Sequence, residues 1–325
     1  MKEMNFAEAL AQGLVECLES DDRVVLMGAG FGGLTPYRSA YGPIRARFSD
    51  RISDPPIAEL GYCGIAIGAA MTGLRPIVAM GTGAFSFEAF PQIANEAPQA
   101  YYGTRGQVTC PVVFHMMTGI RGAGALQHST SPQAMFWNTP GLQVVVPGSP
   151  ADARGLMKTV ALRSDNPTIY IDHQRLQGAT GMVDDSGAGE TPLGVAEVKR
   201  EGTDVTVVAV SVMVPRALEA AETLAKEGIS VEVVDPRTLV PLDKDTILKS
   251  VAKTGKAVIA DETQLSCGVA AEFAAILADE GFASLKAPVK RVAIPNVPIP
   301  YHEAEEIYIT PTAERIVEAV KSICK

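Results

Sequence analysis

Short apolar, β-branched runs alternate along the first half of the chain with segments in which apolar residues recur at the spacing of a helical turn. The first pattern favours buried strands and the second favours helices. Strands this short and apolar, separated by helices, imply a parallel sheet covered on both faces. The predicted strands are 24–27, 76–80, 111–115, 142–147 and 168–172, and the predicted helices are 6–18, 64–72, 87–100 and 150–163.

A polar, glycine-rich stretch between His173 and Pro192 interrupts this pattern, and a second alternating series follows it. Such a change in composition is typical of a linker between domains. We therefore expect an α/β protein with two open parallel-sheet domains in series, residues 1–180 and 193–325, joined by a linker at 181–192. The second series predicts strands at 205–210, 231–234 and 257–260, and helices at 214–227, 244–253, 270–280 and about 312–324.

The composition narrows the class of protein. The net charge of −9 argues against general binding of nucleic acid, which needs a basic face. Five scattered cysteines without a CxxC pair indicate neither a disulfide framework nor a zinc site. Residues 1–19 have an amphipathic helical pattern rather than that of a secretory signal, and the apolar stretch 61–80 is interrupted by polar residues. We expect a cytoplasmic protein.

Glu59 stands directly before a helix of small apolar residues, in the run at 54–61. A carboxylate at the entry of a tightly packing apolar helix is poorly placed for solvation and well placed for a buried proton transfer. The alternative is an ordinary acid at a helix N-terminus, which the helix dipole favours.

A glycine-rich loop at 119–132 carries His128 between Gln127 and Ser129. Small residues let the backbone approach a ligand closely, and the loop aims one imidazole at it. A lone histidine is more often structural, and we interpret His173 and His302 in that way.

The glycines at 28–33 superficially suggest a dinucleotide fingerprint. Gly28 and Gly30 fit G-x-G-x-x-G, but Gly33 leads into Leu-Thr-Pro rather than a helix. No acid ends a second strand about twenty residues later, where one is expected. Binding of a nicotinamide dinucleotide is therefore not favoured.

Glu59, the His128 loop, Phe85 in the run Gly-Thr-Gly-Ala-Phe-Ser-Phe and the run at 233–242 together carry a resemblance. The chain closely resembles the beta subunit of the thiamine-diphosphate-dependent E1 component of 2-oxo acid dehydrogenase complexes, of the pyruvate, branched-chain or acetoin type. The resemblance extends from about Asn5 to Val320. It implies a pyrimidine-binding domain followed by a transketolase C-terminal-like domain.

The resemblance also implies roles for individual residues. Glu59 is expected to bind a ring nitrogen of the aminopyrimidine, so that the exocyclic amine becomes a stronger base. Leu60 and Phe85 are expected to bind the cofactor, with the Phe85 ring against the pyrimidine. His128 is expected to face the reacting carbon and to assist acyl transfer to a lipoyl group.

Thiamine enzymes hold the diphosphate through magnesium bound by a Gly-Asp-Gly motif, and this chain contains none. In the family it resembles, an alpha subunit holds the magnesium and the diphosphate. We therefore expect an α2β2 heterotetramer whose further partner is a lipoyl-bearing E2 acyltransferase. Some relatives also bind potassium through backbone carbonyls, which correspond here to Val112, Ala161 and Asn166.

The chain departs from the family pattern at three positions. Ala29, followed by Gly30, stands where relatives have acids; Gly83 stands where they have an aromatic residue; and His115 stands where many have arginine. Two alternatives stay open: a split transketolase-like ketol-transferase subunit, and a non-catalytic interaction subunit. The sequence does not choose among pyruvate, branched-chain 2-oxo acids and acetoin.

Overall fold

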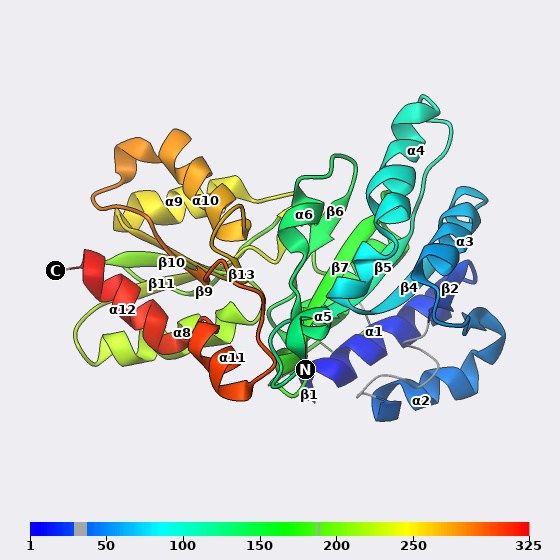
Figure 1. Cartoon of the computed structure of the whole chain (residues 1–325), viewed down its shortest axis with the longest axis horizontal. Helices are drawn as coiled ribbons and strands as arrows, with labels where there is room; N and C mark the ends of the chain where they lie inside the picture. Colours follow the sequence, from blue (N-terminus) through cyan, green and yellow to red (C-terminus); the bar gives the residue numbers. More distant parts are fainter. Residues whose placement is uncertain (29–37, 185, 188, 325) are drawn as a thin grey trace. The chain divides into compact units, whose positions relative to one another are not determined.

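The structure, a computed structural model, describes residues 1–28, 38–184, 186–187 and 189–324, without the side chains of residues 38–40 and 126. The chain divides into two compact units, both of which mix helices and strands (Figure 1). Unit 1 comprises Met1–Gly119 and Gln127–Leu193, and unit 2 comprises Ile120–Leu126 and Gly194–Lys325. The predicted domain bounds, with a linker at 181–192, stay a prediction.

Unit 1 is built on a sheet whose strands follow the order β6, β7, β5, β4, β2, β3 and are all parallel. These strands are β2 (Val24–Met27), β3 (Ile52–Ser53), β4 (Arg75–Thr82), β5 (Val113–Thr118), β6 (Gln143–Val145) and β7 (Thr168–His173). The helices are α1 (Phe6–Ser20), α2 (Arg38–Arg47), α3 (Glu59–Met71), α4 (Ala97–Gly103), α6 (Gln133–Trp137) and α7 (Pro150–Leu162). Single turns of 3-10 helix occur at Ser49–Arg51, Gly83–Phe87 and Gln174–Leu176, and a π-helical turn occurs at Gln92–Glu96.

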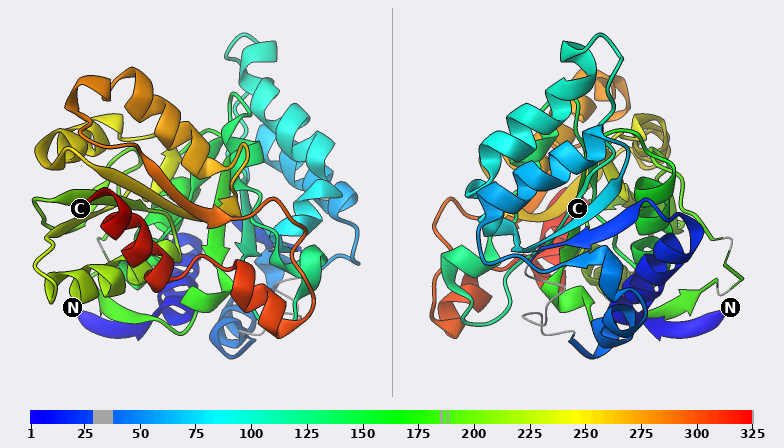
Figure 2. Two further views of the ribbon diagram at one scale, coloured as in Figure 1. Left: turned by 60° about the vertical axis from the view of Figure 1, so that its left-hand side comes forward. Right: turned by 90° about the vertical axis from the view of Figure 1, so that its right-hand side faces the viewer.

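Helices cover both faces of this sheet (Figure 2). On one face the Tyr170 hydroxyl of β7 donates a hydrogen bond to the Ala153 carbonyl of α7 at 2.7 Å. On the other face the Cys63 sulfur of α3 lies 3.3 Å from the Met80 sulfur of β4. Alternate residues of a strand point to opposite faces, so this arrangement favours apolar residues on both faces, and most positions of β2, β4 and β5 are apolar.

The first five residues correct the expectation of a continuous amphipathic helix at 1–19. Lys2–Asn5 forms strand β1, which pairs antiparallel with β8 (Thr180–Val183), so that the predicted linker begins inside a strand. Helix α1 starts only at Phe6, because Asn5 caps it. The Asn5 side chain accepts from the Glu8 backbone at 2.9 Å, and the Glu8 carboxylate accepts from the Asn5 backbone at 3.1 Å.

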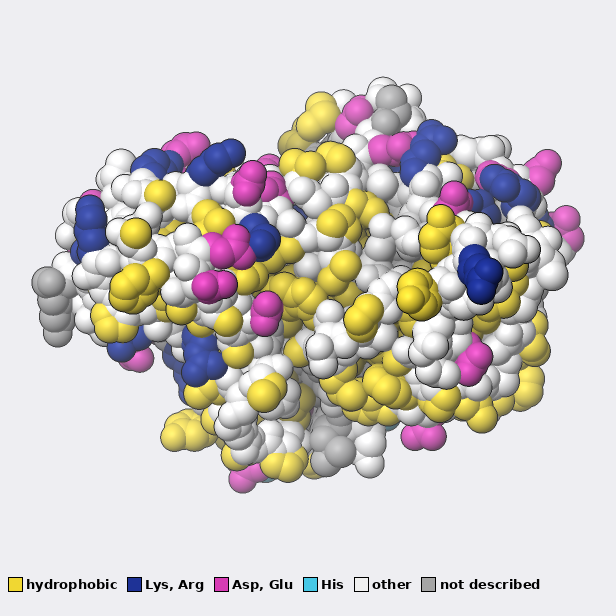
Figure 3. Space-filling view, turned by 90° about the horizontal axis from the view of Figure 1, so that it is seen from above, with side chains coloured by type: hydrophobic (Ala, Val, Ile, Leu, Met, Phe, Trp, Pro, Cys, Tyr) yellow, Lys and Arg dark blue, Asp and Glu magenta, His cyan; other side chains and the backbone are white. Residues whose placement is uncertain are grey.

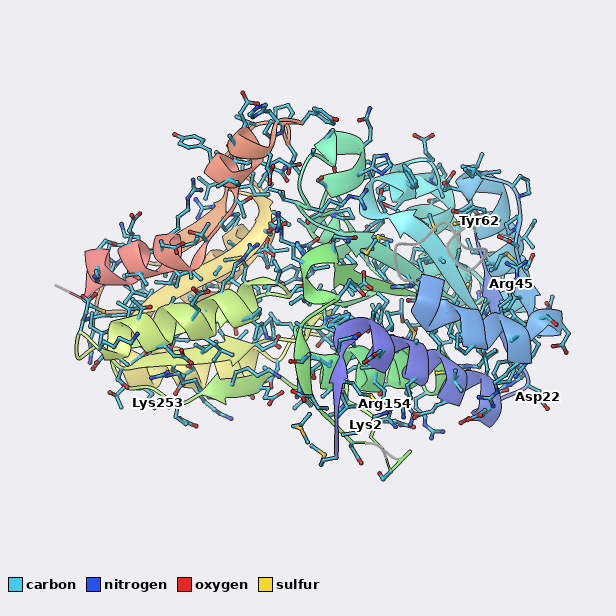
Figure 4. All side chains as sticks on the ribbon, turned by 90° about the horizontal axis from the view of Figure 1, so that it is seen from below. Lys2, Asp22, Arg45, Tyr62, Arg154 and Lys253 are labelled. Carbon is cyan, nitrogen blue, oxygen red and sulfur yellow. The ribbon has the colours of Figure 1, made fainter. Side chains whose placement is uncertain are left out.

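Helices α1 and α7 pack closely against each other. A Cβ at Gly13 would lie 3.1 Å from the Arg154 carbonyl oxygen, so only glycine fits without a shift of the neighbouring backbone. One turn later, Glu16 forms ion pairs with Arg154 at 2.8 Å and with Lys158 at 3.0 Å. Both cationic side chains are buried, and Arg154 lies under α1 in Figure 4.

The Glu16 carboxylate is therefore the counter-ion of two buried cations. Burial alone would raise the pKa of Glu16, but hydrogen bonds from Arg154 and Lys158 outweigh it and lower the pKa from its ordinary value of 4.5. A carboxylate with a lowered pKa stabilises the fold above its unfolded-state pKa, and this stabilisation is lost as the pH falls through the folded-state pKa.

Unit 2 contains a second sheet in the order β14, β13, β10, β11, β9, in which only β9 runs antiparallel to its neighbour. The strands of this sheet are β9 (Glu197–Arg200), β10 (Val205–Ala209), β11 (Val231–Asp235), β13 (Ala257–Gln264) and β14 (Lys290–Ile294). Unit 2 also contains β12 (Thr238–Val240), which is not part of this sheet. Its helices are α8 (Met213–Ala225), α9 (Lys244–Thr254), α10 (Val269–Asp279), α11 (Glu303–Ile309) and α12 (Ala313–Ile323), with a 3-10 turn at Phe282–Ser284. The predicted α/β fold with parallel sheets is confirmed.

The helix predicted at 87–100 is wrong in its bounds and in its regularity. A π-helical turn at Gln92–Glu96 precedes α4, which continues to Gly103. Within the part of the chain that the structure describes, no helix combines the length and the apolar character needed to cross a bilayer. The cytoplasmic location stays a prediction.

We predict that Glu16→Gln destabilises unit 1 at pH 7, because it leaves Arg154 and Lys158 buried without their carboxylate. The expected loss is about 2 kcal/mol in the free energy of unfolding, below the roughly 3–5 kcal/mol of a fully buried pair, since the Glu16 side chain is 15% exposed. Urea unfolding measures it. The difference from wild type should shrink as the pH falls below 4.5, the ordinary pKa of glutamate.

The matched control is Glu19→Gln, in the same helix. Glu19 pairs with Arg47 at the surface, where both side chains are about half exposed. Exposed pairs contribute little to stability. If both variants unfold like wild type at pH 7, the Glu16 network has no stabilising role.

Candidate functional site

Glu59 is the first residue of α3. The preceding residue, Ala58, has no side chain that could cap the helix, so the first turn leaves backbone N–H groups for other partners. Glu59 is only 9% exposed, although it carries a carboxylate. Its carboxylate lies at the positive end of the helix dipole, which favours an anionic side chain there. A carboxylate that is nearly buried at a helix start is a candidate for contact with a ligand.

One helical turn after Glu59, Tyr62 and Cys63 are buried residues of α3, and Tyr62 is labelled in Figure 4. Burial, and then the Glu59 charge, raise the pKa of Tyr62 well above its ordinary range and raise the pKa of Cys63 to about 12. Among the described residues, the Tyr62 hydroxyl has no hydrogen-bond partner. Sequence reasoning missed Tyr62; its spacing of three positions from Glu59 on one helix was the available signal.

Phe85 and His128 are brought together from distant parts of the sequence. Their ring centroids lie 5.4 Å apart at an interplanar angle of 73°, an edge-to-face contact that aromatic rings favour. Phe85 is half-buried and His128 is exposed. The Thr82 hydroxyl donates to the Gln127 carbonyl at 3.2 Å and so ties the His128 segment to the end of β4. Helix α3, which starts with Glu59, packs on the same strand.

The space beside Gly83 is filled. A Cβ at this position would lie 2.7 Å from the Thr118 methyl group, 2.8 Å from the Pro132 ring and 2.8 Å from the Thr130 carbonyl oxygen. The segment that follows His128 therefore occupies the place where relatives have an aromatic side chain. Gly83 brings this segment against the Phe85 turn rather than opening a wider pocket.

The His128 loop begins at Gly119, which has a φ of +97°. A Cβ there would lie 1.8 Å from Nε2 of His173, so no other residue fits. His173 is buried, and its Nδ1 accepts a hydrogen bond from the Arg175 backbone at 3.1 Å. The His173 ring thus packs against Gly119 at the start of the loop, and the His173 backbone pairs with β5.

His115 does not lie with Phe85 and His128. It is buried between β5 and β7, where its Nε2 lies 3.1 Å from Oδ2 of Asp172. Gln177 donates to the same oxygen at 3.0 Å, and the Tyr170 ring contacts His115 edge-on at 5.5 Å. In this chain the position of the family arginine is therefore part of a buried polar network on the α7 side of the sheet.

The other expected positions differ in their surroundings. Leu60 is 51% exposed at the surface of α3. Ala29 and Gly30 lie outside the described residues.

The carbonyls expected to bind potassium accept hydrogen bonds inside unit 1. The Ala161 carbonyl accepts from Nε of Arg75 at 2.5 Å, and the buried guanidinium also donates to the Ser164 carbonyl. The Val112 carbonyl accepts from the Thr168 backbone at 2.9 Å, and the Asn166 carbonyl accepts from the Thr168 hydroxyl at 3.3 Å. Because a fixed cation already binds at Ala161, we assign no role to potassium.

Comparison with known proteins covers nearly the whole chain. The transketolase pyrimidine binding domain matches residues 2–177, and the transketolase C-terminal domain matches residues 194–316. The pyruvate dehydrogenase E1 component subunit beta of Rickettsia felis is 40% identical over 98% of this chain and 97% of its own length. The beta subunit of acetoin:2,6-dichlorophenolindophenol oxidoreductase from Cupriavidus necator is 38% identical over 100% of this chain and 98% of its own length.

Among solved structures, a split gene transketolase in an inactive β4 tetramer is similar, with a TM-score of 0.78 and 27% identity over 97% of this chain and 96% of that one. The E1 beta subunits are more similar in sequence and match over the same length. The chain therefore belongs to the family of E1-component beta subunits, built from a transketolase pyrimidine-binding domain and a transketolase C-terminal domain.

Proposed function

We propose that this chain is the beta subunit of a thiamine-diphosphate-dependent E1 enzyme. With an alpha subunit it catalyses oxidative decarboxylation of a 2-oxo acid and reductive acylation of a lipoyl domain. The observation that carries the proposal is the Phe85–His128 contact at the end of β4, the strand on which the Glu59 helix packs. Pyruvate, branched-chain 2-oxo acids and acetoin are the candidate substrates, and a panel of these compounds tests them.

The residues present fit the pyrimidine half of the cofactor. Thiamine diphosphate, when bound, supplies a ring that stabilises negative charge on carbon, which no protein side chain does. Glu59 would bind a pyrimidine nitrogen and hold a proton there, because its carboxyl group is nearly buried at the start of α3. Phe85 offers a flat apolar ring that orients the cofactor, and Leu60 adds an apolar contact beside Glu59. The unpartnered Tyr62 hydroxyl adds a polar group at the same helix.

His128 acts on the substrate side of this site. Its imidazole is exposed, and the edge-to-face contact with Phe85 limits its rotation. An exposed imidazole can donate a hydrogen bond to a developing oxyanion or to a lipoyl sulfur. His128 would therefore act as the hydrogen-bond donor during acyl transfer.

The exposed face of α3 supports a partner subunit. Leu60 and Ile65 are 51% and 62% exposed, and the glycines between and beyond them, Gly61, Gly64 and Gly68, have no neighbour closer than 3.9 Å to a would-be Cβ. A smooth apolar helix face allows another helix to approach closely. Figure 3, seen from above, shows exposed hydrophobic side chains on unit 1, with charged side chains scattered between them.

We assign this face to the alpha subunit of an α2β2 heterotetramer, which would also hold magnesium and the diphosphate. Within the described ranges, no group of three or more His, Cys, Asp or Glu side chains is placed to bind a metal. An E2 acyltransferase with lipoyl domains is the expected acceptor of the acyl group.

Ketol transfer between sugars is the second candidate, since the similar split gene transketolase shares the whole fold. The higher identity to E1 beta subunits supports the dehydrogenase. A non-catalytic role is opposed by the retention of Glu59, Phe85 and His128. Assaying the assembled enzyme with 2-oxo acids and with a sugar phosphate pair separates these functions.

We predict that Glu59→Gln lowers the kcat for dye-coupled decarboxylation by about 100-fold or more, the usual loss of a general acid–base group. The amide keeps the shape but cannot exchange the proton. The measurement uses the heterotetramer with thiamine diphosphate and magnesium. Glu96→Gln, at an exposed position of the π-helical turn, is the control and should retain wild-type turnover. Full activity of Glu59→Gln would remove Glu59 from the mechanism.

We predict that His128→Asn separates the two half-reactions. Acylation of a lipoyl domain should fall by about 100-fold, because the proton donor is lost. Dye-coupled decarboxylation should change by less, since Glu59 is intact. His302→Asn, at an exposed position of unit 2, serves as the control. Equal losses in both half-reactions would contradict a specific role in transfer.

A further inference from the structure

Two buried carboxylates of unit 2 hold the backbone of the loop stem, residues 120–124. The Ile120 N–H donates to Oε1 of Glu262 at 2.8 Å. The Ala123 and Gly124 N–H groups donate to the two oxygens of Glu306 at 2.8 and 3.2 Å. Glu262 is 2% exposed and Glu306 is 1% exposed. The loop stem is therefore fixed by charged acceptors removed from solvent.

The two carboxylates differ in their surroundings. Glu262 also forms an ion pair with Arg216 at 2.9 Å, so the loop is not its only partner. Glu306 directs each of its oxygens at one of two successive loop amides. Burying a carboxylate costs free energy unless hydrogen bonds compensate, and bonds from N–H groups to a charged acceptor are among the stronger ones. The position of Glu306 is thus explained by the loop that it holds.

The backbone at this point is strained. Ala123 has a φ of +53° and Ala125 has a φ of +54°, in the left-handed region that residues with a Cβ rarely adopt. Such conformations persist only where the surroundings impose them, and they concentrate at functional sites. Ile120 anchors the start of the stem in an apolar cluster with Ile294, Ile299 and Ile309. Glu306 supplies a constraint at Ala123 itself and at Gly124, the residue before Ala125.

We propose that Glu306 is a positioning residue for His128. The amides that it binds directly precede the short helix α5 (Ala125–Ser129), which carries His128. Fixing residues 123–124 therefore sets where this helix begins and which way the imidazole faces. The inference rests on the proposed role of His128 and extends it: the Glu306 carboxylate fixes the backbone from which the His128 helix starts.

The test compares Glu306→Gln with Glu305→Gln, its exposed neighbour in α11. The Glu306→Gln substitution replaces one acceptor oxygen with an NH2 group that faces a loop N–H. Hydrogen–deuterium exchange of the intact chain should show the amides of 120–126 exchanging about tenfold faster or more in Glu306→Gln, and unchanged in Glu305→Gln. Glu306→Asp keeps the charge but has a shorter side chain, and it should also make the amides of 120–126 exchange faster. This variant covers the case in which Glu306→Gln does not fold.

The second measurement uses the heterotetramer. In Glu306→Gln the kcat for lipoyl acylation should fall by about tenfold or more, with the KM for the 2-oxo acid unchanged and dye-coupled decarboxylation less affected. Wild-type exchange rates in both Glu306 variants would overturn the proposal. So would faster exchange with wild-type acylation, because Glu306 would then be only structural. Failure of the proposed function would appear instead as an inactive wild type, and the exchange comparison does not depend on activity.

Discussion

The site depends on one backbone constraint: the chain after β5 must follow left-handed conformations to deliver His128. Gly119 meets the first of these because it has no Cβ to collide with His173. The following residues are not all glycine, and Ala123 adopts a positive φ. The Cβ of alanine disfavours this left-handed conformation. The hydrogen bond from the Ala123 N–H to the buried Glu306 carboxylate stabilises it. The orientation of His128 thus depends on residues that never contact a substrate.

Buried charge serves the same purpose in unit 1. Glu16 satisfies Arg154 and Lys158 between two helices, and Arg75 satisfies the carbonyls at the end of α7. In each case one charged group fixes backbone or side chains that come from separate elements. Surface pairs such as Lys244–Glu280 are more exposed and contribute little by comparison. The fold therefore uses its buried charges to set geometry, whereas the apolar strands supply most of the burial.

Much of the fold could be predicted from the sequence, because its strongest periodic segments coincide with elements that pack on both sides. The helix at α7 and the strands β5 and β7 follow from local pattern alone. Strand β1 could not be predicted, since it exists only by pairing with β8, far along the chain. The π-helical turn before α4 likewise has no periodic signature of its own.

The same distinction holds for the site. Glu59, Phe85 and His128 stand in motifs that a reader of the sequence can find, although their mutual geometry requires the structure. Glu306 could not be found in this way, because its partner Ala123 lies 183 positions away and contributes only a backbone amide. A contact of that kind leaves no side-chain pattern to recognise. Gly83 was visible as a departure, but only the neighbouring Pro132 and Thr130 explain it.

The start of α3 carries both the Glu59 carboxylate and the apolar side chains that we assign to a partner contact. Glu59 is nearly buried in this chain, while Leu60 beside it and Ile65 one turn later are exposed. A partner that covers these apolar side chains would also remove the remaining solvent from the Glu59 carboxyl group. The nearly buried carboxylate and the exposed apolar side chains thus lie at the same end of α3. A surface that packs on Leu60 and Ile65 would also reach Glu59, so the proposed partner contact and the proposed cofactor contact use one part of this helix.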